Sequence, residues 1–109
     1  MLFTYKELSD IAKLMLRRKI FKSREDYRNY TQFVGLFRHI EEDLPIFIYN
    51  GYSYKCSFCG VGGFTARGLY LHIIRKHMDE LIAIIEDRIE RNTKLSREIP
   101  SKWEKIAFI

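Results

Sequence analysis

Residues 54–77 read Tyr54-Lys-Cys-Ser-Phe-Cys-Gly-Val-Gly-Gly-Phe-Thr-Ala-Arg-Gly-Leu-Tyr-Leu-His-Ile-Ile-Arg-Lys-His77. This stretch holds both cysteines of the chain, Cys56 and Cys59, and two of its three histidines, His72 and His77, with the spacing C-x2-C-x12-H-x4-H. Two thiolates and two neutral imidazoles form the closed tetrahedral donor set that Zn²⁺ prefers in structural sites. The spacing therefore predicts that these four residues bind one structural zinc ion.

The length and the ends of the sequence limit the classes of protein it can belong to. A chain of 109 residues forms one domain, or two small halves that share a core. It has no apolar run long enough to cross a bilayer, and Met1–Tyr5 leads directly into charged residues without a signal-peptide pattern. Without an export signal, two cysteines separated by two residues favour metal ligation in a reducing compartment over a disulfide. We therefore expect an intracellular protein that does not bind a membrane.

The net charge of +5 is concentrated in the middle of the chain. Residues 46–78 carry four basic and no acidic side chains, whereas residues 1–45 carry nine basic and seven acidic ones, and residues 79–109 carry six and seven. Basic clusters attract the phosphates of nucleic acids. A second basic group consists of Arg17, Arg18, Lys19, Lys22, Arg24 and Arg28. It either attracts phosphates as well or forms a solvated face with acidic residues nearby.

Two helices are expected before the cysteines. Thr4-Tyr5-Lys6-Glu7 is a capping-box signature, and the apolar residues that follow at helical spacing predict a helix over residues 5–19. Ser23-Arg24-Glu25-Asp26 repeats the start signal and predicts a second helix over residues 24–44, which ends before Pro45.

The rest of the chain predicts a hairpin followed by helices. Asn50-Gly51 lies between two β-prone runs, Ile46–Tyr49 and Tyr52–Lys55, and predicts a hairpin with a type I′ turn. Thr65 is the expected N-cap of a helix that carries both candidate histidine ligands. The helical pattern continues beyond them as an apolar stripe, and a short last helix is expected over residues 100–107; the stripe consists of Met78, Leu81, Ile82, Ile85 and Ile89.

Together with Tyr54 and Leu69, the four candidate ligands make this segment resemble a C₂H₂ zinc finger, and the resemblance covers about 24 of the 109 residues. The resemblance implies a hairpin that supplies the cysteines, a helix that supplies the histidines, and a zinc ion that replaces most of the core. The second aromatic position of that family falls on Gly63, with Phe64 one residue later, so packing there requires a one-residue bulge. Single fingers of this kind are similar to those of small proteins encoded by viruses and mobile elements of hyperthermophilic archaea.

The fold expected from these patterns is α+β, mostly helical, with one ββα finger whose helix extends beyond His77. The segments are a helical pair over residues 1–45, the finger over residues 46–78, and a helical extension over residues 79–109, joined in one compact unit.

The histidine spacing requires an irregular helix. Residues five apart on an ideal α-helix lie about 140° apart around its axis, so His72 and His77 cannot both reach one ion from a regular helix. The turn Ile73–Lys76 is therefore expected to tighten or bulge. The third histidine, His39, has no partner at ligand spacing and is expected at the surface or the edge of the core.

The residues available for nucleic-acid contact favour phosphates over bases. DNA-reading fingers contact bases from positions that correspond here to Thr65, Arg67, Gly68 and Leu71. Of these, Arg67 has a guanidinium that reads guanine well, and Thr65 can touch a base, whereas the other two lack a donor. Phosphate contacts are expected from Lys55, Arg67, Arg75 and Lys76.

Two functions remain open at this stage. The favoured one is a zinc-containing transcriptional regulator that binds double-stranded DNA mainly through phosphates. Its apolar stripe is covered either by the N-terminal helices of the same chain or by a second copy, and of these two arrangements we favour a homodimer with the stripe and the N-terminal helices at the interface. The alternative is a protein–protein interaction module in which zinc is purely structural. An enzyme is not expected, because four protein ligands leave the metal no open position, and no small-molecule substrate is expected.

Overall fold

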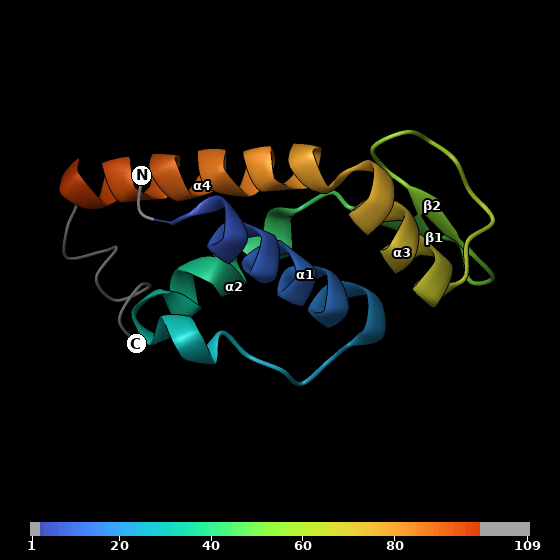
Figure 1. Cartoon of the computed structure of the whole chain (residues 1–109), viewed down its shortest axis with the longest axis horizontal. Helices are drawn as coiled ribbons and strands as arrows, with labels where there is room; N and C mark the ends of the chain where they lie inside the picture. Colours follow the sequence, from blue (N-terminus) through green and yellow to red (C-terminus); the bar gives the residue numbers. More distant parts are fainter. Residues whose placement is uncertain (1–2, 99–109) are drawn as a thin grey trace.

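The fold contains four α-helices, one 3₁₀ helix and one two-stranded antiparallel sheet in the described part of the chain (Figure 1). It is a computed structural model that describes residues 3–98, with side chains as far as Asn92. The elements, in chain order, are α1 (Tyr5–Phe21), η1 (Arg28–Phe33), α2 (Val34–Asp43), β1 (Phe47–Tyr49), β2 (Tyr54–Cys56), α3 (Ala66–Lys76) and α4 (Met78–Glu98). The chain is therefore α+β and mostly helical, as its sequence predicts.

Helix α1 starts and ends where local chemistry requires. The Thr4 hydroxyl accepts from the Glu7 backbone N–H at 3.2 Å, and the Glu7 carboxylate accepts from the Thr4 N–H at 3.0 Å, which completes the predicted capping box. The helix ends at Lys22, which adopts a left-handed conformation with φ 57°. One side of α1 is buried in the core of the molecule.

The expected helix over residues 24–44 is wrong in its first half. Residues 22–27 do not form a helix, and η1 and α2 follow, with non-helical backbone angles at Tyr30. The Ser23 hydroxyl accepts from the Glu25 N–H, two residues on, and so forms a local turn instead of capping a helix. Glu25 in turn binds Arg17 of α1 at 2.8 Å. These contacts hold the segment against α1 and delay the helix.

The hairpin forms, but its turn differs from the expected type I′ turn. Tyr49 pairs with Tyr54 instead of Tyr52, so four residues separate the strands. The Asn50 side-chain oxygen accepts from the N–H groups of Tyr52 and Ser53, both at 2.9 Å, whereas a type I′ turn would join the Tyr52 N–H to the Tyr49 carbonyl. The register moves by two residues, so the alternation of side chains between the two faces is preserved.

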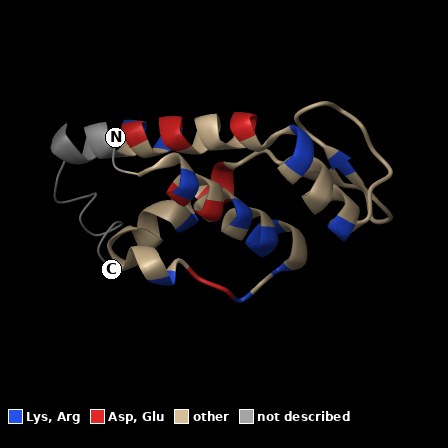
Figure 2. Ribbon diagram, in the orientation of Figure 1, with Lys and Arg blue, Asp and Glu red and all other residues tan. Residues whose placement is uncertain are grey.

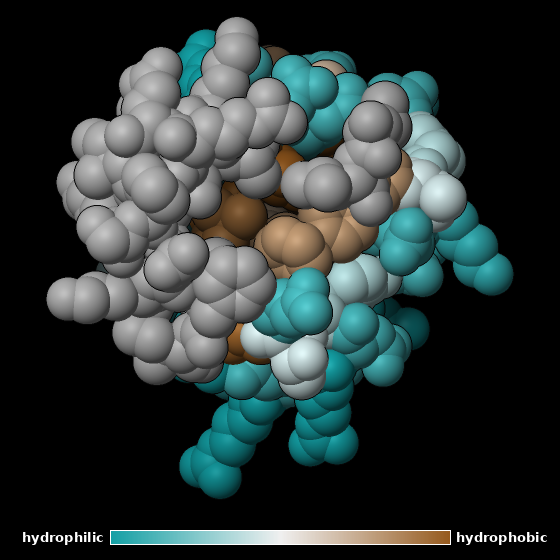
Figure 3. Space-filling model, turned by 90° about the vertical axis from the view of Figure 1, so that its left-hand side faces the viewer, coloured by the Kyte–Doolittle hydropathy of each residue, from teal (hydrophilic) through white to brown (hydrophobic). Residues whose placement is uncertain are grey.

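Helix α4 packs along α1 and α2 and buries the apolar stripe (Figure 1). Four of its five residues are buried, and Met78 is partly buried against the same core. The stripe therefore packs within one chain, the first of the two arrangements open for it, and a homodimer would have to use another surface. Figure 3 views the end of the molecule near the N-terminus, where apolar side chains reach the surface among hydrophilic ones.

The hairpin and α3 lie together at one end of the molecule, beyond α1 (Figure 1). Helix α3 joins the helical part through α1: the Arg17 guanidinium donates to the Tyr70 hydroxyl at 3.3 Å, and the rings of Phe21 and Tyr70 lie 5.4 Å apart. Within residues 3–98, no helix combines the length and the apolar character that crossing a bilayer requires. The short helix expected over residues 100–107 lies outside the described residues.

Candidate metal centre

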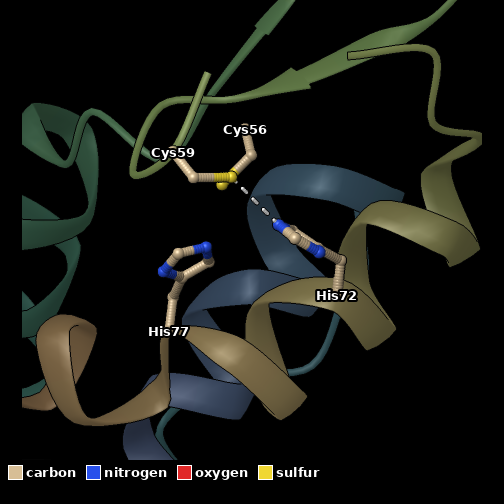
Figure 4. Close-up of side chains that lie close together, drawn as sticks. All are labelled: Cys56, Cys59, His72 and His77. Atoms are coloured by element: carbon tan, nitrogen blue, oxygen red, sulfur yellow. Dashed lines mark hydrogen bonds between the residues drawn. The ribbon is translucent and has the colours of Figure 1, made fainter. Parts of the chain in front are cut away.

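The structure brings the four residues of the Cys/His pattern together between the hairpin and α3 (Figure 4). Cys56 ends β2, Cys59 lies in the turn after it, His72 lies on α3, and His77 follows the last residue of that helix. One donor atom from each residue lies within 4.8 Å of the others. Two sulfur and two nitrogen atoms at these separations could hold a metal ion.

The turn between the cysteines directs backbone N–H groups at the sulfurs. The Gly60 N–H donates to the Cys56 carbonyl at 2.9 Å, and Gly60 has a φ of 79°, which a residue with a side chain rarely adopts. The pKa of the Cys59 thiol is lowered to about 6, mainly by a hydrogen bond from the Val61 N–H and to a smaller extent by one from the His72 side chain. Burial raises the pKa of Cys56, and the N–H groups of Cys59 and Phe58 act against this. The turn therefore stabilises thiolate at Cys59, the form that binds metals.

The helix breaks at His77, which allows both histidines to face the cysteines. His77 has φ −129° and ψ 15°, outside the helical region, so α3 ends at Lys76 and α4 begins at Met78. The backbone bonds continue across the break, since the His77 N–H donates to the Ile73 carbonyl at 2.8 Å. An irregularity was expected because of the spacing, but it falls on His77 itself and not in the turn Ile73–Lys76.

His77 has one nitrogen engaged and one without a protein partner. Its side chain is buried, and Nδ1 lies 3.0 Å from Oε1 of Glu80. Its Nε2 is buried and has no hydrogen-bond partner among the described residues. Burial opposes protonation, yet the Glu80 carboxylate and the Cys59 sulfur raise the pKa of His77 overall. A buried nitrogen lone pair beside two sulfurs fits a metal ion, which would supply the missing partner.

His72 is oriented by an aromatic ring on its other side. The Cys59 Sγ and the His72 Nε2 lie 3.4 Å apart (Figure 4). This agrees with the roughly 3.5 Å that separates sulfur and nitrogen when both bind one tetrahedral zinc ion. The Phe64 ring stacks on His72 with centroids 4.6 Å apart. Gly63, with φ 79°, supplies the bend that brings Phe64 into this position, as the one-residue offset from the finger pattern required.

The residues expected to contact nucleic acid surround the finger and do not share one face. Arg67 and Arg75 lie about 80° apart on α3, on the side away from the core, whereas Lys76 lies about 180° from Arg67. Lys55 lies on the other face of the hairpin, beside Ile48. These four basic side chains are exposed, and within residues 3–92 no carboxylate lies in ion-pair range of any of them.

Thr65 also has a structural role. It is the N-cap of α3, as predicted, and its hydroxyl accepts from the Gly68 N–H at 3.0 Å. His39, which was expected away from the metal centre, is exposed on α2.

Two residues near the metal centre were not identified from the sequence. Glu80 binds His77, and a carboxylate three residues after a helical histidine is a signal that could have been used. Phe58 stacks on His77 with ring centroids 5.2 Å apart, a contact that no local spacing indicates.

Comparisons of the chain with protein-family models, with curated proteins and with solved structures found no match. The donor set and its geometry are therefore the basis for the function proposed below.

Proposed function

We propose that Cys56, Cys59, His72 and His77 bind one Zn²⁺ ion in a ββα finger of the C₂H₂ kind. The observation that carries this proposal is the convergence of two sulfurs and two imidazoles around a buried nitrogen without a partner, the Nε2 of His77. Zinc bound by four protein ligands has no open position for a substrate, so its role is to hold the hairpin against α3. We therefore propose a binding protein and not an enzyme.

We further propose that the finger binds double-stranded DNA through phosphate contacts, as an intracellular regulator of transcription does. The supporting observation is the charge of the finger: Figure 2 shows basic residues and no acidic ones on the hairpin and α3, whereas α4 carries several acids. Two arginines of α1 differ, because Arg17 and Arg18 are paired with Glu25 and Glu41. Unpaired cations on a small folded unit attract a polyanion most strongly.

We assign the phosphate contacts mainly to Arg67 and Arg75. Both lie on the outward side of α3, with Leu71 between them around the helix and Ile74 on the far side of Arg67. We give Lys55 and Lys76 a smaller part, because Lys76 lies about 180° from Arg67 around α3 and Lys55 lies on the hairpin beside Ile48. Base reading is weak on this face, because Gly68 has no side chain and Leu71 has no donor.

A salt titration of binding to a random-sequence duplex tests this proposal. Two phosphate contacts give a slope of log K against log salt of roughly −2 between about 50 and 200 mM. The double variant Arg67→Ala/Arg75→Ala should bring this slope close to zero. The matched double variant Lys6→Ala/Arg28→Ala removes two exposed charges outside the finger and should leave the slope unchanged. Absence of binding at about 50 mM salt, or an equal loss in both variants, contradicts the proposal.

The second candidate function is a protein-interaction module in which zinc only holds the hairpin against α3. It is favoured by exposed apolar side chains on the hairpin and the loop after it, where Ile48 is 60%, Tyr49 53%, Tyr52 96% and Val61 50% exposed. Large apolar side chains left in water are available for contact with another protein.

A further inference from the structure

Strand β1 has one edge that is paired and one that is free. Ladder bonds join the flanking positions on the β2 side: Ser57 N–H donates to the Ile46 carbonyl at 3.0 Å, and Asn50 N–H donates to the Ser53 carbonyl at 3.2 Å. Bonds in an antiparallel ladder recur at every second residue, so Ile48 directs its N–H and C=O toward β2. The N–H and C=O groups of Phe47 and Tyr49 must then point to the opposite side.

The far side of β2 confirms this alternation. Tyr54, which pairs with Tyr49, exchanges two backbone bonds with Phe64 at 2.8 and 3.0 Å on the side away from β1. Strand β2 is therefore paired on both sides, and β1 forms the outer edge of the sheet. No backbone bond of Phe47 or Tyr49 to any residue outside β2 occurs within residues 3–98.

The free edge has the features of a docking strand. Proteins usually protect such edges with charged residues or proline, and Phe47–Tyr49 contains neither. Ile48 and Tyr49 are more than half exposed, although β-branched and aromatic side chains on a sheet normally pack against a neighbour. An added strand would bond to the open N–H and C=O groups and cover the Ile48 side chain.

We propose that the edge of β1 binds an extended acidic segment of a partner protein by adding it to the sheet as a further strand. The charge of the finger selects the occupant. Residues 46–78 carry four basic and no acidic side chains, and the exposed Lys55 lies directly beside Ile48 across the ladder. A segment with carboxylates is attracted to this surface, whereas a second copy of the finger brings a net charge of the same sign and is repelled. This surface is separate from the outward side of α3 that carries Arg67 and Arg75.

A binding assay with a defined peptide tests the proposal on the full chain purified with its metal. The probe is a short fluorescein-labelled peptide of alternating glutamate and valine, titrated by fluorescence anisotropy. The variant Ile48→Thr keeps a β-branched residue and should weaken binding about tenfold, because the apolar contact is lost. The matched variant Val61→Thr makes the same change at an exposed finger position away from the edge, and it should leave the affinity unchanged.

A second peptide separates strand addition from simple charge attraction. The same sequence with an N-methyl group on every backbone amide keeps its carboxylates but has no N–H to donate from either side, so its binding should be lost. In the complex with the unmodified peptide, the amide protons of Phe47 and Tyr49 should exchange with solvent more slowly. Equal binding of the methylated peptide, or an equal effect of both threonine variants, overturns the proposal. Self-association of the protein without peptide that Ile48→Thr abolishes also overturns it, because the occupant would then be a second copy.

Discussion

The Nδ1 atom of His77 lies 3.0 Å from Oε1 of Glu80, three residues later, and this contact turns the Nε2 atom of His77 toward the two cysteines. A carboxylate on the outer nitrogen of a metal-binding histidine fixes the orientation of the ring and raises its basicity. Glu80 also belongs to the first turn of α4, where an acid is favoured by the helix dipole. One side chain thus links the start of α4 to the metal centre.

Replacing Glu80 should weaken metal binding without removing a ligand. We expect Glu80→Ala to reduce the zinc affinity by about tenfold to a hundredfold, the usual effect of losing such a partner. Glu80→Gln keeps an oxygen that can accept from the His77 ring, so it should reduce the zinc affinity less than Glu80→Ala does. The matched variant Asp79→Ala removes the neighbouring acid of the same helical turn, which binds Tyr5 and not His77. Competition with a chromophoric chelator measures the three affinities, and equal losses in Asp79→Ala and Glu80→Ala would count against the role of Glu80.

Removing the metal should unfold the finger and leave part of the helical core. Small fingers have too little core to fold without metal. The contacts of α1 and α2 with α4 do not involve the candidate ligands, so these helices should keep much of their structure. Circular dichroism of Cys56→Ser should show a partial loss of helix and a lower melting temperature. A melting curve identical to that of the wild-type protein would contradict a structural role for the metal.

Away from the finger, removing the Glu41 side chain should lower the stability of the helical core. Its carboxylate accepts from the Arg18 guanidinium at 2.7 Å and from the Tyr27 hydroxyl, and Tyr27 is fully buried. Glu41→Ala leaves the buried Tyr27 hydroxyl without a partner and Arg18 with only the Glu25 carbonyl and Asp26, which should lower the free energy of unfolding by about 2–3 kcal/mol. The exposed neighbour Glu42 provides the control, since Glu42→Ala should change the free energy of unfolding by less than about 0.5 kcal/mol. Urea unfolding of the zinc-loaded proteins measures both values.

Asp26 should make the stability depend on pH in the acid range. Partial burial opposes its ionisation, but the Tyr27 N–H and the Arg38 guanidinium together lower its pKa below the ordinary 3.8. A depressed carboxyl pKa adds stability above the ordinary value, and this stability is lost as the pH falls through the lower folded value. Asp26→Asn should therefore destabilise the protein at about pH 6 and lose this effect below about pH 4. A difference in unfolding free energy that stays constant across this range would show that the charge has no part in it.

The candidate metal centre was predictable because its information is local. The four ligand types lie at fixed spacings in one stretch, and the helix starts at Thr4 and Thr65 depend on bonds that span three residues. The need for a break between His72 and His77 followed from helix geometry alone. Its position at His77 could not be derived, since either a tightened turn or a single non-helical residue satisfies the same requirement.

Two predictions were wrong, the helix start at residues 23–26 and the type of hairpin turn. In both, side chains form bonds that the local sequence pattern does not indicate. Ser23–Asp26 has the composition of a helix start, but Glu25 binds Arg17 and Asp26 binds Arg38, and these contacts hold the segment outside a helix. The hairpin turn differs because the side chain of Asn50 accepts the Tyr52 N–H, which would bond to the Tyr49 carbonyl in a type I′ turn, and the Ser53 N–H as well.

X-ray absorption at the zinc edge, on protein purified without chelator, tests the metal centre most directly. We expect one zinc ion per chain, with two sulfur ligands at about 2.3 Å and two nitrogen ligands at about 2.0 Å. In Cys59→Ser the sulfur count should fall to one and zinc should be lost more readily to a chelator. A folded chain that contains no zinc, or a zinc spectrum unchanged by Cys59→Ser, would contradict the proposed site.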